Sequence, residues 1–153
     1  MIITFIGHSF VTSIEDVKKQ VKEQVEKHMN SCSESMTCYL GGYGEFDELC
    51  AMACRDLKRK GLNIHLVYVT PYISLPVQKK IRDLQQNGLY DEVFYPPIEN
   101  TPIKFAISKR NEWMIKRSDL IIAYVNHNYG GAYKSLKIAK RIKKNIINIC
   151  EFL

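Results

Sequence analysis

The sequence lacks the short motifs by which many cofactor and metal sites are recognised. It contains no GxGxxG dinucleotide fingerprint, no GxxxxGK phosphate loop and no HExxH zinc site. Its four histidines show no metal-ligand spacing, and no paired Cys/His set exists. No nucleophile elbow of the GxSxG kind is present either. We therefore expect no metal centre and no standard dinucleotide or Walker A site.

Cysteine is scarce and unpaired, and long apolar runs are missing. The five cysteines form an odd set without any CxxC, and they are Cys32, Cys38, Cys50, Cys54 and Cys150. Such cysteines fit a role as small buried hydrophobes in a reducing compartment. There is no secretory signal and no apolar run of about 18 residues. We expect a cytoplasmic protein without a membrane span.

Positive charge is concentrated in one segment. The chain has 153 residues, a length typical of one domain, and a net charge of +6. Residues 134–144 hold six basic side chains and no acidic one, so this segment accounts for the whole excess. Its periodicity favours the solvated face of an amphipathic helix, with contact to nucleic acid as the alternative.

Apolar runs alternate with amphipathic segments along the whole chain. The runs predict strands at 2–6, 36–40, 64–69, 92–95, 119–125 and 145–149. Most helices are expected between them, and the strands show little polar alternation, which is typical of a parallel sheet covered on both faces. We predict a single α/β domain over residues 1–153, a three-layer Rossmann-like, doubly wound fold with five or six mostly parallel strands.

Glycines follow three of the predicted strands. They are Gly7 after the first strand, Gly41, Gly42 and Gly44 after the second, and Gly130 and Gly131 after the fifth. Ligands of open α/β sheets bind outside the carboxyl ends of the strands. Glycine lets backbone N–H groups approach an anion there, and a following helix N-terminus favours negative charge. The three loops, extended to His8 and Ala132, are therefore candidate ligand-binding segments, although tight strand-to-helix turns also need glycine.

Charged and polar residues near these loops are further candidates. Arg110 falls on the apolar side of its predicted helix, so it needs an anionic ligand, an internal partner such as Asp47 or Asp119, or a route to solvent. Asp47 is expected to cap the second helix, and Glu45 could reach a ribose hydroxyl. His8 and His127 both follow strands and are candidates for a pocket rim.

Four segments stand out in the order "FIGH", "GGYGEFDELC", "KFAISKRNEWMIKRSDLIIAYV" and "YGGAYKSLKIA", and they span nearly the whole chain. Together they resemble the SLOG superfamily, most closely its small bacterial YspA-like proteins. The resemblance implies a Rossmann-like fold associated with nucleotides or nucleotide-derived ligands. It includes a distant similarity to the Lonely guy phosphoribohydrolases, in which Arg110 matches the arginine of the equivalent helix.

The resemblance to the phosphoribohydrolases stops after Gly130 and Gly131, which match the start of their PGGxGTxxE loop. Tyr133 stands in place of the third glycine, and Lys137 stands in place of the catalytic glutamate. Without that carboxylate, binding is better supported than turnover. Glu45, Asp47 and Glu48 are the weak candidates for a replacement.

Three functions remain open at this stage. The leading expectation is a binding domain for a small nucleotide-like ligand, held by the glycine loops with Arg110 as the anion partner. The alternatives are an enzyme that cleaves the glycosidic bond of nucleotides, and a nucleic-acid binder that uses the basic helix. A homodimer is also left open.

Overall fold

The computed structural model describes residues 1–32 and 35–153, with side chains given for residues 1–30 and 35–153. Its six strands are β1 (Ile2–Gly7), β2 (Met36–Leu40), β3 (Ile64–Val69), β4 (Glu92–Phe94), β5 (Leu120–Tyr124) and β6 (Asn145–Asn148). Its five α-helices are α1 (Ile14–Cys32), α2 (Glu45–Arg59), α3 (Leu75–Gln86), α4 (Ala106–Arg117) and α5 (Gly130–Arg141). Two short 3-10 helices are η1 (Ile103–Phe105) and η2 (Ile149–Phe152).

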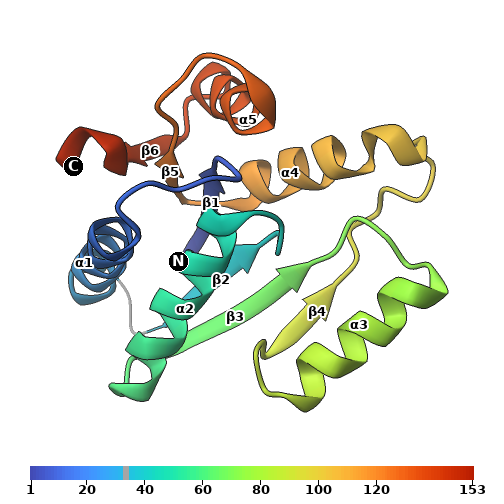
Figure 1. The fold of residues 1–153 in the computed structure, drawn as a ribbon, viewed down its shortest axis with the longest axis horizontal. Helices are drawn as coiled ribbons and strands as arrows, with labels where there is room; N and C mark the ends of the chain where they lie inside the picture. The colour runs from blue at the N-terminus through green and yellow to red at the C-terminus, as the bar shows by residue number, and fades with distance from the viewer. Residues whose placement is uncertain (33–34) are drawn as a thin grey trace.

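All six strands form one parallel sheet in the order β4-β3-β2-β1-β5-β6. Figure 1 shows the chain running outward from β1 to β4 and then crossing to the other side of β1 for β5 and β6. This reversal makes the space above β1 and β5 the switch point at which doubly wound sheets bind ligands. The predicted α/β fold is confirmed, with six strands that are all parallel.

The two faces of the sheet carry separate cores. One core joins β1 and β2 to apolar side chains of α1 and α2, including Val21 and Phe46. The other packs Ile121 of β5 against Ile115 of α4 and Leu136 of α5. Side chains of β1 alternate between these cores, as the two-residue period of a strand requires. The sheet is therefore covered by helices on both sides, which fits its nearly continuous apolar strands.

The described cysteines behave as core residues. Cys38, Cys50 and Cys54 are free thiols and completely buried, and the sulfur atoms of Cys38 and Cys54 lie 3.9 Å apart. The hydrogen bond with Cys54, together with burial, raises the pKa of Cys38 well above its usual value. Burial likewise raises the pKa of Cys50, so Cys38 and Cys50 are poor nucleophiles. The side chain of Cys32 lies outside the described part.

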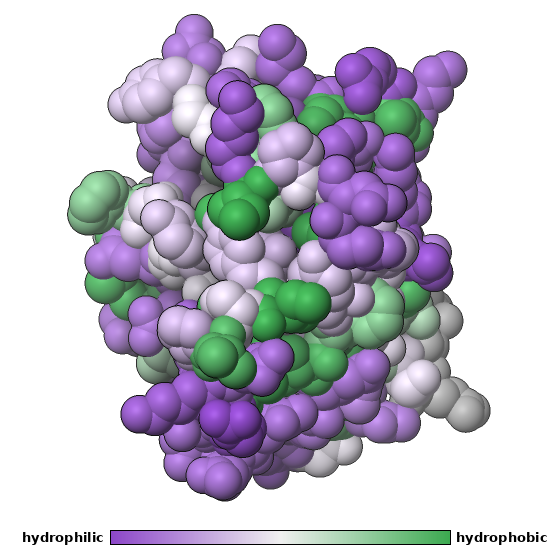
Figure 2. Space-filling view, turned by 90° about the vertical axis from the view of Figure 1, so that its right-hand side faces the viewer, coloured by the Kyte–Doolittle hydropathy of each residue, from purple (hydrophilic) through white to green (hydrophobic). Residues whose placement is uncertain are grey.

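The helix α3 packs only loosely on the rest of the fold. It lies beside β4, and none of its residues is buried. Figure 2 shows the face that carries α3 and the start of α4, where apolar side chains gather across the middle. Large apolar residues exposed on these elements and the segments before them are Ile73, Leu75, Ile103 and Phe105. Within the described ranges, no helix has the length and apolarity needed to cross a membrane.

Candidate functional site

A cavity of about 720 Å³ lies at the carboxyl edge of the sheet, above β1 and β5. The segments after β1, β2 and β5 form its walls together with α4 and the start of α5. Its polar and glycine lining consists of Thr4, Gly7, His8, Ser9, Thr12, Asp47, Arg110, Asn111, Asn126, His127, Gly130, Gly131 and Ser135. The size is ordinary for a small-molecule site.

The N-terminus of α5 opens into this cavity without a side-chain cap. Tyr129 is the N-cap residue in extended conformation, and its side chain makes no capping hydrogen bond. The first N–H groups of a helix have no partner within the helix, and the helix dipole adds partial positive charge there. This end of α5 is therefore suited to an anionic group.

The two glycines that begin α5 differ from the glycines of the other loops. Gly130 has a φ of 88°, a conformation that L side chains rarely adopt. Gly131 has no such requirement, and a Cβ added to it would meet no atom within 4 Å. The packing of the protein itself thus gives no reason for glycine at position 131, whereas close approach of a ligand would.

The glycines at the end of β1 and after β2 make room for other parts of the protein. A Cβ on Gly7 would lie 2.1 Å from the Phe46 ring, and one on Gly42 would lie 2.1 Å from the Tyr68 ring. A Cβ on Gly41 would lie 2.9 Å from Cζ of Arg110. The segment "GGYGEFDE" is thus shaped by the side chains that pack against it, and among its glycines and those of the first loop only Gly7 lines the cavity.

Arg110 is buried beneath the cavity wall, with 2% of its surface exposed. Its Nη1 donates to the carbonyl oxygens of Gly41 (2.9 Å) and Val69 (2.8 Å), and its Nε donates to Oδ1 of Asn111 (2.8 Å). The burial expected from the helical pattern is confirmed. The expected ion pairs with Asp47 or Asp119 are not formed. The guanidinium instead donates its hydrogen bonds to the carbonyl groups where β2 and β3 end. Its Nη2 donates to no atom of the described residues.

Asp47 is the carboxylate that faces the cavity. Its Oδ2 accepts a hydrogen bond from the backbone N–H of Tyr43 (3.2 Å). Burial raises the pKa of Asp47 to about 6, although this N–H and the charge of Arg110 both act to lower it. Its expected role as the N-cap of α2 is wrong: the helix begins at Glu45, and Gly44 is the N-cap.

The other two candidate carboxylates lie elsewhere. Oε2 of Glu45 accepts from the backbone N–H of Val11 (2.6 Å), so this carboxylate fixes the segment after β1. Glu48 is exposed and does not line the cavity. Among the three, Asp47 alone is placed to meet a ligand in the cavity.

His8 and His127 form part of a column of stacked rings along one wall. Their ring centroids are 3.5 Å apart with planes at 13°, and the rings of His127 and Tyr129 follow at 3.9 Å and 21°. Nε2 of His8 accepts from the backbone N–H of Asn126 (3.1 Å), so this nitrogen carries no proton. Burial and the neighbouring His127 lower the pKa of His8, so the inner ring of the column is neutral at pH 7.

Two buried polar atoms at the cavity have no hydrogen-bond partner among the described residues. They are Oγ1 of Thr4, a residue that is completely buried, and Nδ1 of His127. Buried polar atoms nearly always have a partner in the protein or in solvent. Both residues line the cavity, so both atoms are candidates for contact with a bound molecule.

The cavity brings together most of the residues predicted from the sequence. Gly7, His8, Asp47, Arg110, Gly130, Gly131 and Ala132 line it, whereas Gly41, Gly42, Gly44 and Glu45 do not. Sequence reasoning missed Thr4, Asn111 and the aromatic rim Phe10, Tyr43 and Tyr129. The aromatic residues could have been found, since each stands in or beside a segment that follows a strand. No group of three His, Cys, Asp or Glu side chains in the described ranges is placed to hold a metal ion.

The comparisons with known proteins identify the fold. No protein-family model and no curated protein matches the chain. DNA processing protein A from Helicobacter pylori has a similar structure, with a TM-score of 0.61 and 16% identity, and the match covers 95% of this chain and 63% of that one. The structural-genomics target TM1055 is similar with a TM-score of 0.58 and 11% identity, over 95% of this chain and 71% of that one. At such identities the likeness shows the fold alone: this chain shares the Rossmann-like α/β architecture of these two structures.

Proposed function

We propose that the chain binds a nucleotide or a nucleotide-derived ligand in the cavity above β1 and β5. The phosphate lies at the uncapped N-terminus of α5, where Gly131 lets it approach the backbone N–H groups. Asp47 accepts hydrogen bonds from ribose hydroxyls, and Thr4 provides a further hydroxyl on the cavity wall. The resemblance of the sequence to SLOG proteins supports the same class of ligand.

The observation that carries this proposal is the open space at Gly131. Glycine in a helix interior costs about 0.5–1 kcal/mol relative to alanine, and in the first turn, where Gly131 stands, it still loses more backbone freedom on folding than alanine does. Neither backbone conformation nor packing explains that cost at position 131. A ligand whose phosphate occupies the space explains it.

The proposal is tested with Gly131→Ala and Gly131→Val in calorimetric titrations. We expect Gly131→Ala to keep or raise the melting temperature of the protein and to lower its affinity for a nucleoside 5′-monophosphate tenfold or more. Gly131→Val should abolish binding, and Lys134→Ala, on the exposed part of the same helix, should leave affinity unchanged. Wild-type affinity in both Gly131 variants, or no binding of any of the four common monophosphates to the wild type, would contradict the proposal.

Nucleic-acid binding is the second candidate, and the basic surface of α5 favours it. Lys134, Lys137, Lys140 and Arg141 are exposed, and none lines the cavity. The similar protein from Helicobacter pylori binds single-stranded DNA. A polynucleotide would follow this surface through its phosphates, with a strong dependence on salt.

A further inference from the structure

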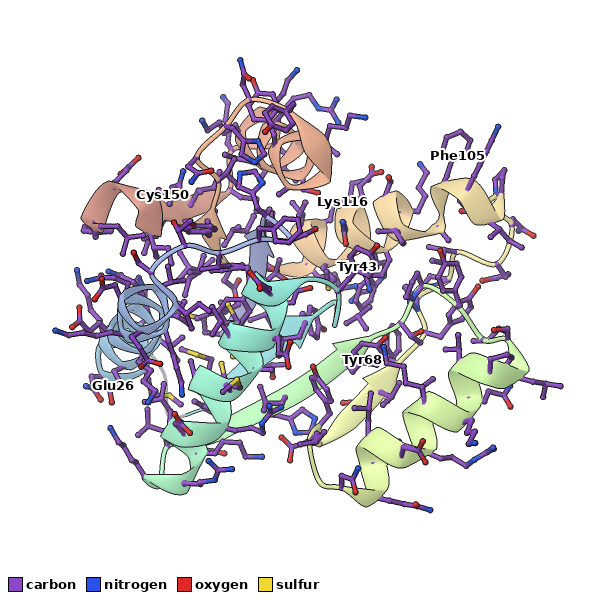
Figure 3. The ribbon with its side chains drawn as sticks, viewed as in Figure 1. Glu26, Tyr43, Tyr68, Phe105, Lys116 and Cys150 are labelled. Carbon is purple, nitrogen blue, oxygen red and sulfur yellow. The ribbon has the colours of Figure 1, made fainter. Side chains whose placement is uncertain are left out.

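Three large aromatic side chains are exposed at the mouth of the cavity. Phe10 is 84% exposed, and Tyr43 and Tyr129 are each 68% exposed. They come from three separate segments, after β1, β2 and β5, and all three line the same cavity. Figure 3 shows Tyr43 between the start of α2 and α4. Exposed aromatic groups that gather around a cavity mark a binding surface, because each leaves a large apolar area in water.

Tyr129 is held by the ring column that begins at His8. Within the column, His127 packs against one face of Tyr129, and no further ring of the described residues stacks on Tyr129. The inner end is fixed by the hydrogen bond from the N–H of Asn126 to His8. The column is therefore an ordered support whose last ring still has an aromatic face available.

We propose that a flat aromatic ring of the ligand, the base of a nucleotide, stacks on Tyr129 at the end of this column. Tyr43 and Phe10 cover the bound base from the opposite segments of the mouth. This inference rests on the proposed function, since it takes the phosphate at the start of α5 as given. Tyr129 directly precedes Gly130 and Gly131, so the base and phosphate subsites adjoin and a single nucleotide reaches both.

Stacking explains why the mouth is aromatic and carries little charge. The ring column is neutral at His8, and among the Asp, Glu, Lys and Arg side chains that the structure describes, only those of Asp47 and Arg110 line the cavity. Base recognition by stacking tolerates different bases, because every base offers a π-face. We therefore expect the site to accept several bases and to discriminate strongly against ligands that have none.

The test compares Tyr129→Ala, Tyr129→Phe and the wild type with three ligands: adenosine 5′-monophosphate, adenosine and ribose 5-phosphate. Loss of one aromatic stacking partner weakens the binding of a base by about 5- to 150-fold. Tyr129→Ala should therefore bind the nucleotide and the nucleoside at least fivefold more weakly than the wild type does, and its affinity for ribose 5-phosphate should be unchanged. Tyr129→Phe should bind all three ligands as the wild type does. The side chain of Tyr129 makes no capping hydrogen bond, so its removal leaves the helix start intact.

A matched control and a direct readout of stacking complete the experiment. Phe105→Ala removes a half-exposed aromatic ring that stands directly before α4 and does not line the cavity. This variant should bind all three ligands as the wild type does. The fluorescence of 2-aminopurine riboside monophosphate should fall on binding to the wild type and to Tyr129→Phe, and much less on binding to Tyr129→Ala.

The outcomes separate this inference from the proposed function. If ribose 5-phosphate binds as tightly as the nucleotide and Tyr129→Ala changes neither, the stacking site is wrong and the phosphate site stands. If the nucleoside binds, depends on Tyr129 and gains nothing from its phosphate, the phosphate site is wrong and the stacking site stands. Binding of none of the three ligands by the wild type would overturn both.

Discussion

Arg110 and Asp47 show how single residues can serve the fold and the site together. The guanidinium of Arg110 satisfies carbonyl groups where β2 and β3 end, and its charge acts on Asp47 in the cavity. Replacing Arg110 by alanine would leave buried carbonyl groups without a donor, at a cost of about 1–3 kcal/mol each. An Arg110→Ala variant that binds poorly would therefore not separate ligand contact from loss of stability, whereas Gly131 and Tyr129 allow that separation.

Asp47 makes the stability of the fold depend on pH in an unusual direction. Its pKa is raised from 3.8 to about 6 in the folded state, so the folded protein holds this proton more tightly than the unfolded chain. The carboxylate therefore destabilises the fold by up to about 3 kcal/mol above pH 7, and this penalty shrinks as the pH falls through 6 towards 4. Asp47→Asn should be more stable than the wild type at pH 7.5 and close to it at pH 4, as measured by urea unfolding.

Asp56 provides a control, because its pKa is shifted in the opposite direction and its charge should stabilise the fold. Its pKa is lowered to about 2 by hydrogen bonds from Lys22 and Lys18. A carboxyl group whose pKa is lowered by folding stabilises the folded state at every pH above its pKa in the unfolded chain. Asp56→Asn should therefore be less stable than the wild type at pH 7.5 and also at pH 4.5. An Asp47→Asn variant that differs from the wild type by the same amount at pH 7.5 and pH 4 would show that Asp47 does not titrate as described.

At the scale of elements, α5 combines two different surfaces. Its N-terminus faces the cavity, while the side chains that carry the positive charge point into solvent. Lys144, just beyond the helix, is an exception, because its Nζ donates to the carbonyl oxygens of Lys116 (2.9 Å) and Ser118 (2.8 Å). It therefore holds the end of α4 in place and is unsuited to a test of surface charge.

Charge reversal of Lys137, Lys140 and Arg141 distinguishes the two candidate functions. All three are exposed and outside the residues that line the cavity. Since exposed charges are screened beyond about 10 Å at 0.1 M salt, mononucleotide affinity should stay within about twofold of the wild type. The measurement is calorimetry with a mononucleotide, alongside fluorescence anisotropy with a labelled single-stranded oligonucleotide at two salt concentrations. Oligonucleotide binding that is steeply salt-dependent and lost in the triple variant would favour the nucleic-acid candidate instead.

At the scale of the whole molecule, the sequence was sufficient for the fold, whereas the place of the ligand site stays a prediction. The apolar runs, and the glycines that follow them, predicted a parallel sheet with its glycine-containing loops on one edge, because parallel strands end at the same edge. The roles of individual residues depended on contacts that periodicity does not encode. Gly42 makes room for Tyr68, Arg110 binds carbonyl groups, and Glu45 fixes the segment after β1, all through partners distant in the sequence.

The carboxylates that line the cavity bear on whether the proposed nucleotide site could also cleave its ligand. In the sequence resemblance to phosphoribohydrolases, Lys137 takes the place of their catalytic glutamate. It lies outside the residues that line the cavity, with its Nζ 5.6 Å from the centroid of the Tyr133 ring. Among the described residues, Asp47 is the one carboxylate in the lining, and glycoside hydrolysis usually needs a pair. We therefore expect incubation with nucleoside monophosphates to release no free base above the buffer control, as followed by liquid chromatography. Release of base that disappears in Asp47→Asn, but persists in Glu45→Gln and Glu48→Gln, would instead assign the chain to nucleotide cleavage and make Asp47 its catalytic residue.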